Sequence, residues 1–271
     1  MKDTSKRPIG IFDSGIGGLT VVAEMMKRLP NEDIVYFGDI GRFPYGVRSP
    51  EVIKKFSRQN VRFLLMQKVK YVVVACNTAS AQALNAIRRN FDIPMMGVIE
   101  PGAYGAVSTT KNRKVGVIGT AGTIASSSYT KAIQKLDGKI KVVAAATPLF
   151  VALAEEGYLD RPASHLIVQD YLLPIKKRGI DTLVLGCTHY PLLRNVIAKV
   201  MGHRVFLVDS AEWTVKAVKE DLQTRTLLNH SRIPGKYRYF VSDTPEKFIQ
   251  VGNRFLGRDV APAKRIDIEK Y

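Results

Sequence analysis

Short apolar runs alternate along the chain with longer stretches whose apolar residues recur at helical spacing. Residues 9–13, 33–37 and 71–75 are apolar and predict β-strands. Residues 19–29, 50–67 and 79–89 predict amphipathic helices, and Ser49 and Pro50 are a typical N-cap and first-turn residue for the second helix. Strands that alternate with helices in this way are typical of an α/β fold in which helices cover both faces of a parallel sheet.

The pattern restarts near residue 100. Residues 114–120 resemble residues 8–14, and residues 179–188 resemble residues 69–78 at a similar offset. This predicts two related doubly wound lobes, each with a mainly parallel sheet, although all parallel α/β chains share some of this likeness. Later residues predict a helix (211–228), a strand (237–242), a helix (245–255) and a strand (263–268). If these strands complete the first sheet, residues 1–100 plus 210–271 form the first lobe, with Cys76, and residues 101–209 form the second, with Cys187.

Cys76 and Cys187 each end an apolar strand and open a loop that leads to a helix. Hydroxyl or amide residues follow both of them: Asn77 and Thr78 after the first, and Thr188 after the second. In open α/β sheets, ligands bind at the carboxyl ends of the strands, and the N-terminus of a helix binds carboxylates and lowers the pKa of a thiol. A lone buried cysteine is usually a core residue. Two cysteines in matching positions favour a functional pair.

Three further positions carry residues that could take part in catalysis or binding, although their sequence patterns are less specific than those of the cysteines. Residues 13–18 form a glycine-rich turn after a strand, but Thr20 replaces the third glycine of a dinucleotide fingerprint, so the glycines would instead let the backbone approach a small ligand. Asp13 there could take a proton, bind an ammonium group or cap the next helix. Glu155 ends a short apolar helix and is either a site residue or a solvated terminus. His189 lies two residues after Cys187, which leaves a Cys/His hydrolase possible.

Composition narrows the class of protein. The chain has 271 residues, of which 46% are hydrophobic and 24% charged, which is ordinary for a globular protein. Two cysteines exclude a disulfide scaffold, and no His or Cys pair has metal-ligand spacing, so we expect no metal. The polar N-terminus lacks a signal-peptide core, and the longest apolar-leaning run, 142–154, is too short to cross a membrane. We expect a cytoplasmic protein with reduced thiols and no membrane partner.

The net charge of +17 points to an anionic partner. The basic residues are spread along the chain, without a basic tail or a stripe interleaved with aromatic residues. A generally basic solvated surface therefore explains the charge better than a specific nucleic-acid site. Nucleic-acid binding stays as an alternative that salt-dependent binding would support.

At the residues singled out above, the sequence closely resembles the cofactor-independent glutamate racemases of the aspartate/glutamate racemase family. The matching stretches are residues 12–18 (FDSGIGG), 75–79 (ACNTA), 97–101 (GVIEP), 186–191 (GCTHYP) and 208–212 (VDSAE). One departure lies in the turn-rich loop 38–46. There the family usually has Thr-Ala or Asn-Ala, and this chain has Ile40 and Gly41. The loop residues that match are Gly38, Asp39, Arg42, Pro44, Tyr45 and Gly46.

The resemblance implies two α/β lobes with the active site in the cleft between them. It implies interconversion of L- and D-glutamate, the latter for peptidoglycan precursors, by a homodimer that needs no cofactor. Cys76 and Cys187 would be the acid/base residues, the first acting on D-glutamate and the second on L-glutamate. Asp13, Glu155 and His189 would assist them. The implied substrate contacts are Asp13, Ser14, Tyr45, Gly46, Asn77, Thr78, Thr188 and His189.

Two thiols suit racemisation because a proton must leave one face of Cα and another must arrive on the opposite face. A pyridoxal phosphate enzyme would need a Schiff-base lysine, and no motif identifies one, so preorganised donors would have to stabilise the carbanion. The nearest alternatives are racemases of aspartate or a hydantoin. His189 favours glutamate, since aspartate racemases usually place an acidic residue at that position.

Overall fold

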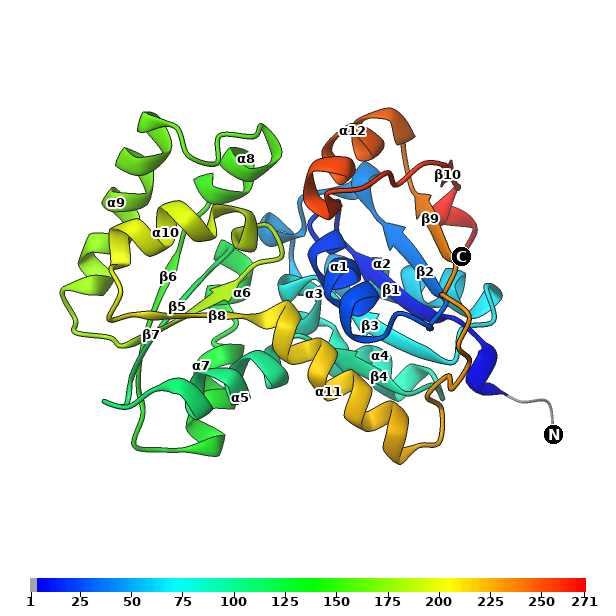
Figure 1. Cartoon of the computed structure of the whole chain (residues 1–271), viewed down its shortest axis with the longest axis horizontal. Helices are drawn as coiled ribbons and strands as arrows, with labels where there is room; N and C mark the ends of the chain where they lie inside the picture. The colour runs from blue at the N-terminus through cyan, green and yellow to red at the C-terminus, as the bar shows by residue number, and fades with distance from the viewer. Residues whose placement is uncertain (1–3) are drawn as a thin grey trace.

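Two parallel sheets form the frame of the molecule (Figure 1). The structure is a computed structural model and describes residues 4–271. The first sheet has the order β10-β9-β2-β1-β3-β4 and the second β6-β5-β7-β8. The strands are β1 (Ile9–Asp13), β2 (Ile34–Gly38), β3 (Tyr71–Val74), β4 (Met95–Gly97), β5 (Lys114–Gly119), β6 (Lys141–Ala146), β7 (Thr182–Gly186), β8 (Phe206–Asp209), β9 (Tyr237–Val241) and β10 (Ala263–Arg265).

The two sheets share one strand order. In the first sheet β1 lies between β2 and β3, with β4 beyond β3, and in the second β5 lies between β6 and β7, with β8 beyond β7. All pairings among the described strands are parallel. The predicted α/β class with two related, mainly parallel lobes is therefore confirmed. Cys76 and Cys187 follow the equivalent strands β3 and β7.

Helices cover both faces of each sheet, as Figure 1 shows. On the first sheet, α1, α11 and α12 pack on one face and α2, α3 and α4 on the other. On the second, α5 and α7 pack on one face and α8, α9 and α10 on the other. The helices are α1 (Leu19–Arg28), α2 (Pro50–Met66), α3 (Asn77–Gln82), α4 (Leu84–Asn90), α5 (Ile99–Thr109), α6 (Ala121–Ala125), α7 (Ser128–Leu136), α8 (Leu149–Glu155), α9 (Pro162–Lys176), α10 (Arg194–Met201), α11 (Ser210–Thr224) and α12 (Pro245–Leu256).

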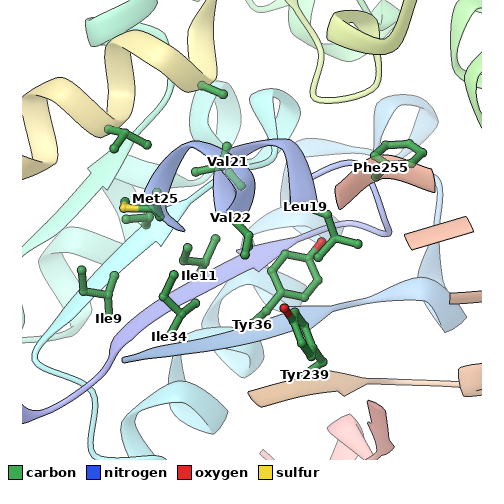
Figure 2. Packing of buried hydrophobic residues seen from close by; sticks show 14 of the residues in the cluster. Ile9, Ile11, Leu19, Val21, Val22, Met25, Ile34, Tyr36, Tyr239 and Phe255 are labelled. Carbon is green, nitrogen blue, oxygen red and sulfur yellow. The ribbon is translucent and has the colours of Figure 1, made fainter. Parts of the chain in front are cut away.

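The central strand β1 shows why the inner strands are mostly apolar. All five of its residues are buried, because Ile9 and Ile11 face α1 whereas Phe12 faces the helices on the other side. Leu19 and Met25 of α1 pack on the first of these faces (Figure 2). A strand buried on both faces reads as a continuous apolar run, which is what the sequence shows.

Several predicted boundaries are wrong. The predicted helix 79–89 begins earlier, at Asn77, and breaks at Ala83 into α3 and α4. The predicted helix 211–228 ends at Thr224, and Thr226 has a left-handed backbone with φ 55°. The predicted strand 263–268 ends at Arg265, and a short 3-10 helix follows at Ile268–Lys270. No helix among residues 4–271 has both the length and the apolarity needed to span a bilayer.

Candidate active site

A pocket of about 290 Å³ lies between the carboxyl ends of the two sheets. Strand ends of both sheets contribute to its wall, so the folding of each half brings part of the site into place. All but one of the predicted site residues line it, namely Ser14, Tyr45, Gly46, Cys76, Asn77, Thr78, Glu155, Cys187, Thr188 and His189. Asp13 is fully buried behind this wall.

Cys76 lies between the end of β3 and the first turn of α3. Its sulfur accepts a hydrogen bond from the backbone N–H of Ala79 at 3.4 Å and donates one to Oγ of Ser14 at 3.5 Å. Burial and the nearby Asp13 carboxylate nevertheless raise the pKa of this thiol from 9.0 to about 12. The amide at the helix N-terminus does lower the pKa of Cys76, as expected, but desolvation and the like charge of Asp13 outweigh this one contact and the net shift is upward.

Cys187 lies at the end of β7 beside an imidazole. Its sulfur is 3.7 Å from Nδ1 of His189, whose Nε2 is 3.0 Å from Oε1 of Glu155. Burial disfavours a charged imidazole, but the contacts with Cys187 and Glu155 raise the pKa of His189 from 6.5 to about 10. These contacts favour the imidazolium form of His189, and a cation so close to a sulfur favours negative charge on that sulfur.

Two aromatic rings hold the His189 side chain in place. Phe43 lies with its ring centroid 6.0 Å away, and Phe255 of α12 meets the imidazole edge-on at 5.6 Å. Only 2% of His189 is exposed. The imidazole is thus held within an apolar wall, with its two nitrogens directed to Cys187 and Glu155.

Asp13 connects the loops that follow β1 and β7. One carboxylate oxygen accepts the backbone N–H of Gly15 at 2.9 Å and the other the hydroxyl of Thr188 at 3.4 Å. Burial raises the pKa of this carboxyl above 3.8. A Cβ at Gly17 would lie 2.4 Å from Oγ1 of Thr188 and 2.5 Å from Nδ1 of His189. This glycine allows the two loops to approach each other, rather than a ligand to approach the backbone as predicted.

Polar side chains from both halves meet around the rest of the pocket. The hydroxyls of Thr78, Thr120 and Thr123 lie 2.9 to 3.2 Å from one another. Tyr129 of α7 donates a hydrogen bond of 2.7 Å to Oδ1 of Asn77. Sequence reasoning missed Thr120, although it ends the segment that resembles residues 8–14 and so corresponds to Ser14. For Tyr129 and Phe43 no local pattern gives a signal.

The arrangement places acid/base groups from the two sheets on one small pocket. Cys76 lines the pocket with a thiol whose pKa is raised, and Cys187 lines it beside an imidazole whose contacts favour its cationic form. Such a pair can accept a proton on one side of a bound molecule and donate one on the other. Among residues 4–271, no group of three or more His, Cys, Asp or Glu side chains is arranged to hold a metal ion.

Comparisons with known proteins agree with this geometry. Residues 18–218 match the Asp/Glu/Hydantoin racemase family. A glutamate racemase from Geobacter metallireducens is 51% identical over 97% of both chains. The structure of a glutamate racemase isoform from Bacillus anthracis superposes with a TM-score of 0.94 at 41% identity, covering 97% of this chain and 98% of the other. That of Francisella tularensis glutamate racemase, in complex with D-glutamate, has a TM-score of 0.92 at 40% identity, covering 98% and 100%. The chain therefore belongs to the Asp/Glu/hydantoin racemase family and is an amino-acid racemase.

Proposed function

We propose that this racemase interconverts L- and D-glutamate without a cofactor, using Cys76 and Cys187 as its two acid/base groups. The observation that carries the proposal is that both sulfurs line one pocket although they come from equivalent strands of two different sheets. Two groups so placed can address opposite faces of one Cα atom. A single group would tend to return the proton to the face from which it came.

In the direction from L- to D-glutamate, Cys187 acts as the base and Cys76 as the acid. The imidazolium of His189 supports the first assignment, and the high pKa of Cys76 supports the second. The Cys187 thiolate takes the Cα proton of L-glutamate, and the electron pair stays on the substrate as a carbanion. The Cys76 thiol then protonates the opposite face, which gives D-glutamate, a Cys76 thiolate and a Cys187 thiol. The reverse reaction starts from that second state.

The neighbouring groups have different tasks. Glu155, together with Cys187, favours the charged form of His189. Asp13 adds to the effect of burial in keeping Cys76 protonated, so that Cys76 can act as the acid. Hydrogen-bond donors on the pocket wall stabilise the substrate carboxylates and the carbanion. We assign substrate binding to Asp13, Ser14, Tyr45, Gly46, Asn77, Thr78, Thr188 and His189, of which all but Asp13 line the pocket.

Several observations favour glutamate, rather than aspartate or a hydantoin, as the substrate. His189 stands two residues after Cys187. The relatives from Geobacter metallireducens and Bacillus anthracis, which match over nearly the whole chain, are glutamate racemases. The Francisella tularensis relative binds D-glutamate in its structure. The net charge of +17, spread along the chain, is consistent with a dianionic substrate.

The wider setting is proposed on the family resemblance. D-Glutamate would supply peptidoglycan precursors, and the enzyme would work in the cytoplasm as a homodimer. We also propose a division into two lobes, residues 1–100 plus 210–271 and residues 101–209. This division is supported by the strands, since residues 9–97 and 237–265 contain the first sheet and residues 114–209 the second. Sedimentation equilibrium tests the dimer.

The activity is tested by incubating the enzyme with each glutamate enantiomer in deuterium oxide. We expect the opposite enantiomer to form from either direction, with solvent deuterium at its Cα. L-Aspartate and an enantiopure hydantoin serve as comparison substrates and should turn over far more slowly. Product that lacks the label would contradict proton transfer at Cα, and faster turnover of aspartate or the hydantoin would contradict glutamate as the substrate.

A further inference from the structure

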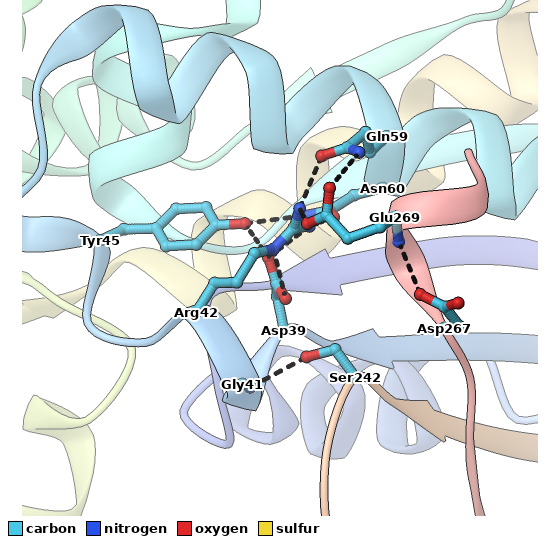
Figure 3. A network of polar contacts seen from close by, with 9 residues as sticks. All are labelled: Asp39, Gly41, Arg42, Tyr45, Gln59, Asn60, Ser242, Asp267 and Glu269. Atoms are coloured by element: carbon cyan, nitrogen blue, oxygen red, sulfur yellow. Dashed lines mark hydrogen bonds and ion pairs between the residues drawn. The ribbon is translucent and has the colours of Figure 1, made fainter.

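A polar network lies behind the wall segment that contains Tyr45 and Gly46. Both residues line the pocket, and Gly46 packs so closely on the second half that a Cβ there would lie 2.7 Å from Cβ of Thr120. The hydroxyl of Tyr45 is directed away from the pocket, toward Asp39 and Arg42 (Figure 3). The position of this segment therefore depends on groups that do not touch the pocket.

Arg42 is the centre of that network. Its Nε lies 2.8 and 3.0 Å from the two carboxylate oxygens of Asp39, which is fully buried at the end of β2. One terminal nitrogen donates to Gln59 at 2.6 Å and the other to Asn60 at 3.1 Å, both on α2. Only 12% of the Arg42 side chain is exposed. The guanidinium thus connects the loop after β2 to the helix that follows it.

Tyr45 is attached to the same groups. Its hydroxyl donates to the Asp39 carboxylate and accepts a hydrogen bond of 3.1 Å from Nδ2 of Asn60. Burial and the charge of Asp39 raise the pKa of Tyr45 well above 10, so the hydroxyl stays a donor. Phe56 of α2 packs on both side chains, with its ring 4.1 Å from the Arg42 guanidinium carbon and 5.6 Å from the Tyr45 ring.

Residues 268–271 contact this network on its solvent-exposed side. Glu269 accepts from Arg42 at 3.0 Å through one carboxylate oxygen and from Gln59 at 3.2 Å through the other. Ile268 is buried in the core beneath α2, and Arg62 of α2 donates a hydrogen bond of 2.8 Å to the backbone oxygen of Tyr271. A segment more than 200 residues away in sequence thus contacts the loop that forms the pocket wall.

We propose that Arg42, held between Asp39 and Glu269, is a positioning residue that fixes Tyr45 and Gly46 for substrate binding, with the C-terminal 3-10 helix as the outer part of the clamp. The proposal rests on the proposed function insofar as Tyr45 and Gly46 contact the substrate. Arg42 does not line the pocket, so it acts only through the loop. Its effect should appear in substrate affinity more than in the proton-transfer step.

Lysine cannot replace this arginine, because an ammonium cannot make the planar, forked contacts to a carboxylate and two amides at once. In Arg42→Lys the buried Asp39 carboxylate loses its paired donors, and Tyr45 is free to shift. A displacement of the order of 1 Å in a substrate-positioning group can change catalysis by about a hundredfold. We expect KM for both glutamate enantiomers to rise by about tenfold or more, with kcat changing less.

The experiment compares Arg42→Lys and the milder Glu269→Gln with the wild type. The matched control is Arg113→Lys, which alters an exposed arginine paired with Asp137 at 3.3 Å far from the network. We measure KM and kcat in both directions, and hydrogen exchange of the peptide spanning residues 43–48 by mass spectrometry. We expect Arg42→Lys to raise KM and to speed exchange in that peptide, Glu269→Gln to do both to a smaller extent, and the control to do neither.

The exchange measurement separates this proposal from the proposed function. If the wild type does not racemise glutamate, the substrate assignment is wrong, and exchange in residues 43–48 still decides whether Arg42 positions the loop. An unchanged KM with unchanged exchange in Arg42→Lys would overturn the positioning role. Exchange that rises equally over β7 would also overturn it, because Arg42 would then stabilise the whole fold rather than the loop. If Arg42→Lys does not fold, Glu269→Gln alone must show both effects for the proposal to stand.

Discussion

The surroundings of Cys76 and Cys187 differ in charge although the two cysteines follow equivalent strands. Cys76 is buried near the Asp13 carboxylate, which adds to the effect of burial and raises the pKa of the thiol to about 12. Cys187 lies 3.7 Å from the imidazole of His189, which Glu155 holds in its charged form. The repeated topology places the two cysteines at equivalent strand ends, and their unequal neighbours, a carboxylate at Cys76 and an imidazole at Cys187, suit the acid and base roles that we propose for them. An enzyme that must begin with one base and one acid needs that inequality.

The largest expected effect comes from removing either sulfur. We expect Cys76→Ala and Cys187→Ala each to lower racemisation by at least about a thousandfold, since each removes a required acid/base group. The remaining cysteine should still be able to remove the Cα proton of one enantiomer. Cys76→Ala should therefore exchange the Cα proton of L-glutamate with deuterium oxide without inversion. Cys187→Ala should exchange that of D-glutamate only at high pH, because its remaining Cys76 must first lose a proton.

The chain has no third cysteine to act as a matched control, so the melting temperature and circular dichroism of each variant must show that it folds. Near-normal turnover in both directions by either variant would exclude the two-base mechanism. Exchange of the other enantiomer by each variant would reverse the assignment of the two faces.

A smaller effect is expected from the imidazole beside Cys187. His189→Asn removes the cation, and we expect kcat/KM to fall by about a hundredfold, within the usual range for one acid/base group. The fall must be equal in both directions, because the equilibrium constant between enantiomers is fixed at one. His165→Asn is the matched control, since His165 also pairs with a carboxylate, Asp160 at 2.7 Å, but on the surface. Equal losses in the two variants would remove any special role for His189.

The smallest effect concerns stability as a function of pH. Burial opposes the charge on His189, but Cys187 and Glu155 raise its pKa from 6.5 to about 10. The folded state therefore binds this proton more tightly, and the stabilisation is complete below about pH 6.5 and lost as the pH rises through about 10. The raised pKa of Cys76 acts in the same sense between about 9 and 12.

Chemical denaturation across this pH range separates the two groups. We expect the free energy of unfolding to fall as the pH rises from 6.5 to 10 in the wild type and in His165→Asn, and to fall less in His189→Asn. Cys76→Ala should flatten the curve only at higher pH. If His189→Asn and the wild type keep parallel curves, His189 does not bind its proton more tightly in the folded state.

Much of the fold follows from local patterns, because strands buried on both faces are mostly apolar. The break at Ala83 carries no glycine or proline, so no local pattern predicts it. The positions of Cys76 and Cys187 at strand ends were predictable from the same alternation. The contact between Glu155 and His189 joins separate elements, α8 and the loop after β7, and depends on how they pack. The high pKa of Cys76 likewise depends on burial and on Asp13, which the sequence alone does not place beside it.

The central claim is that the neighbours of the two sulfurs set their roles: burial and Asp13 keep Cys76 a thiol, and the imidazole beside Cys187 favours a thiolate there. Thiolate ultraviolet absorbance, followed over a pH titration of Cys76→Ala and Cys187→Ala, measures each sulfur alone. We predict that Cys76→Ala, which keeps Cys187, absorbs as a thiolate at neutral pH and loses that absorbance when His189→Asn is added. Cys187→Ala, which keeps Cys76, should gain thiolate absorbance only as the pH approaches about 12. Equal titration of the two variants, or a thiolate at Cys76 alone, would contradict the account.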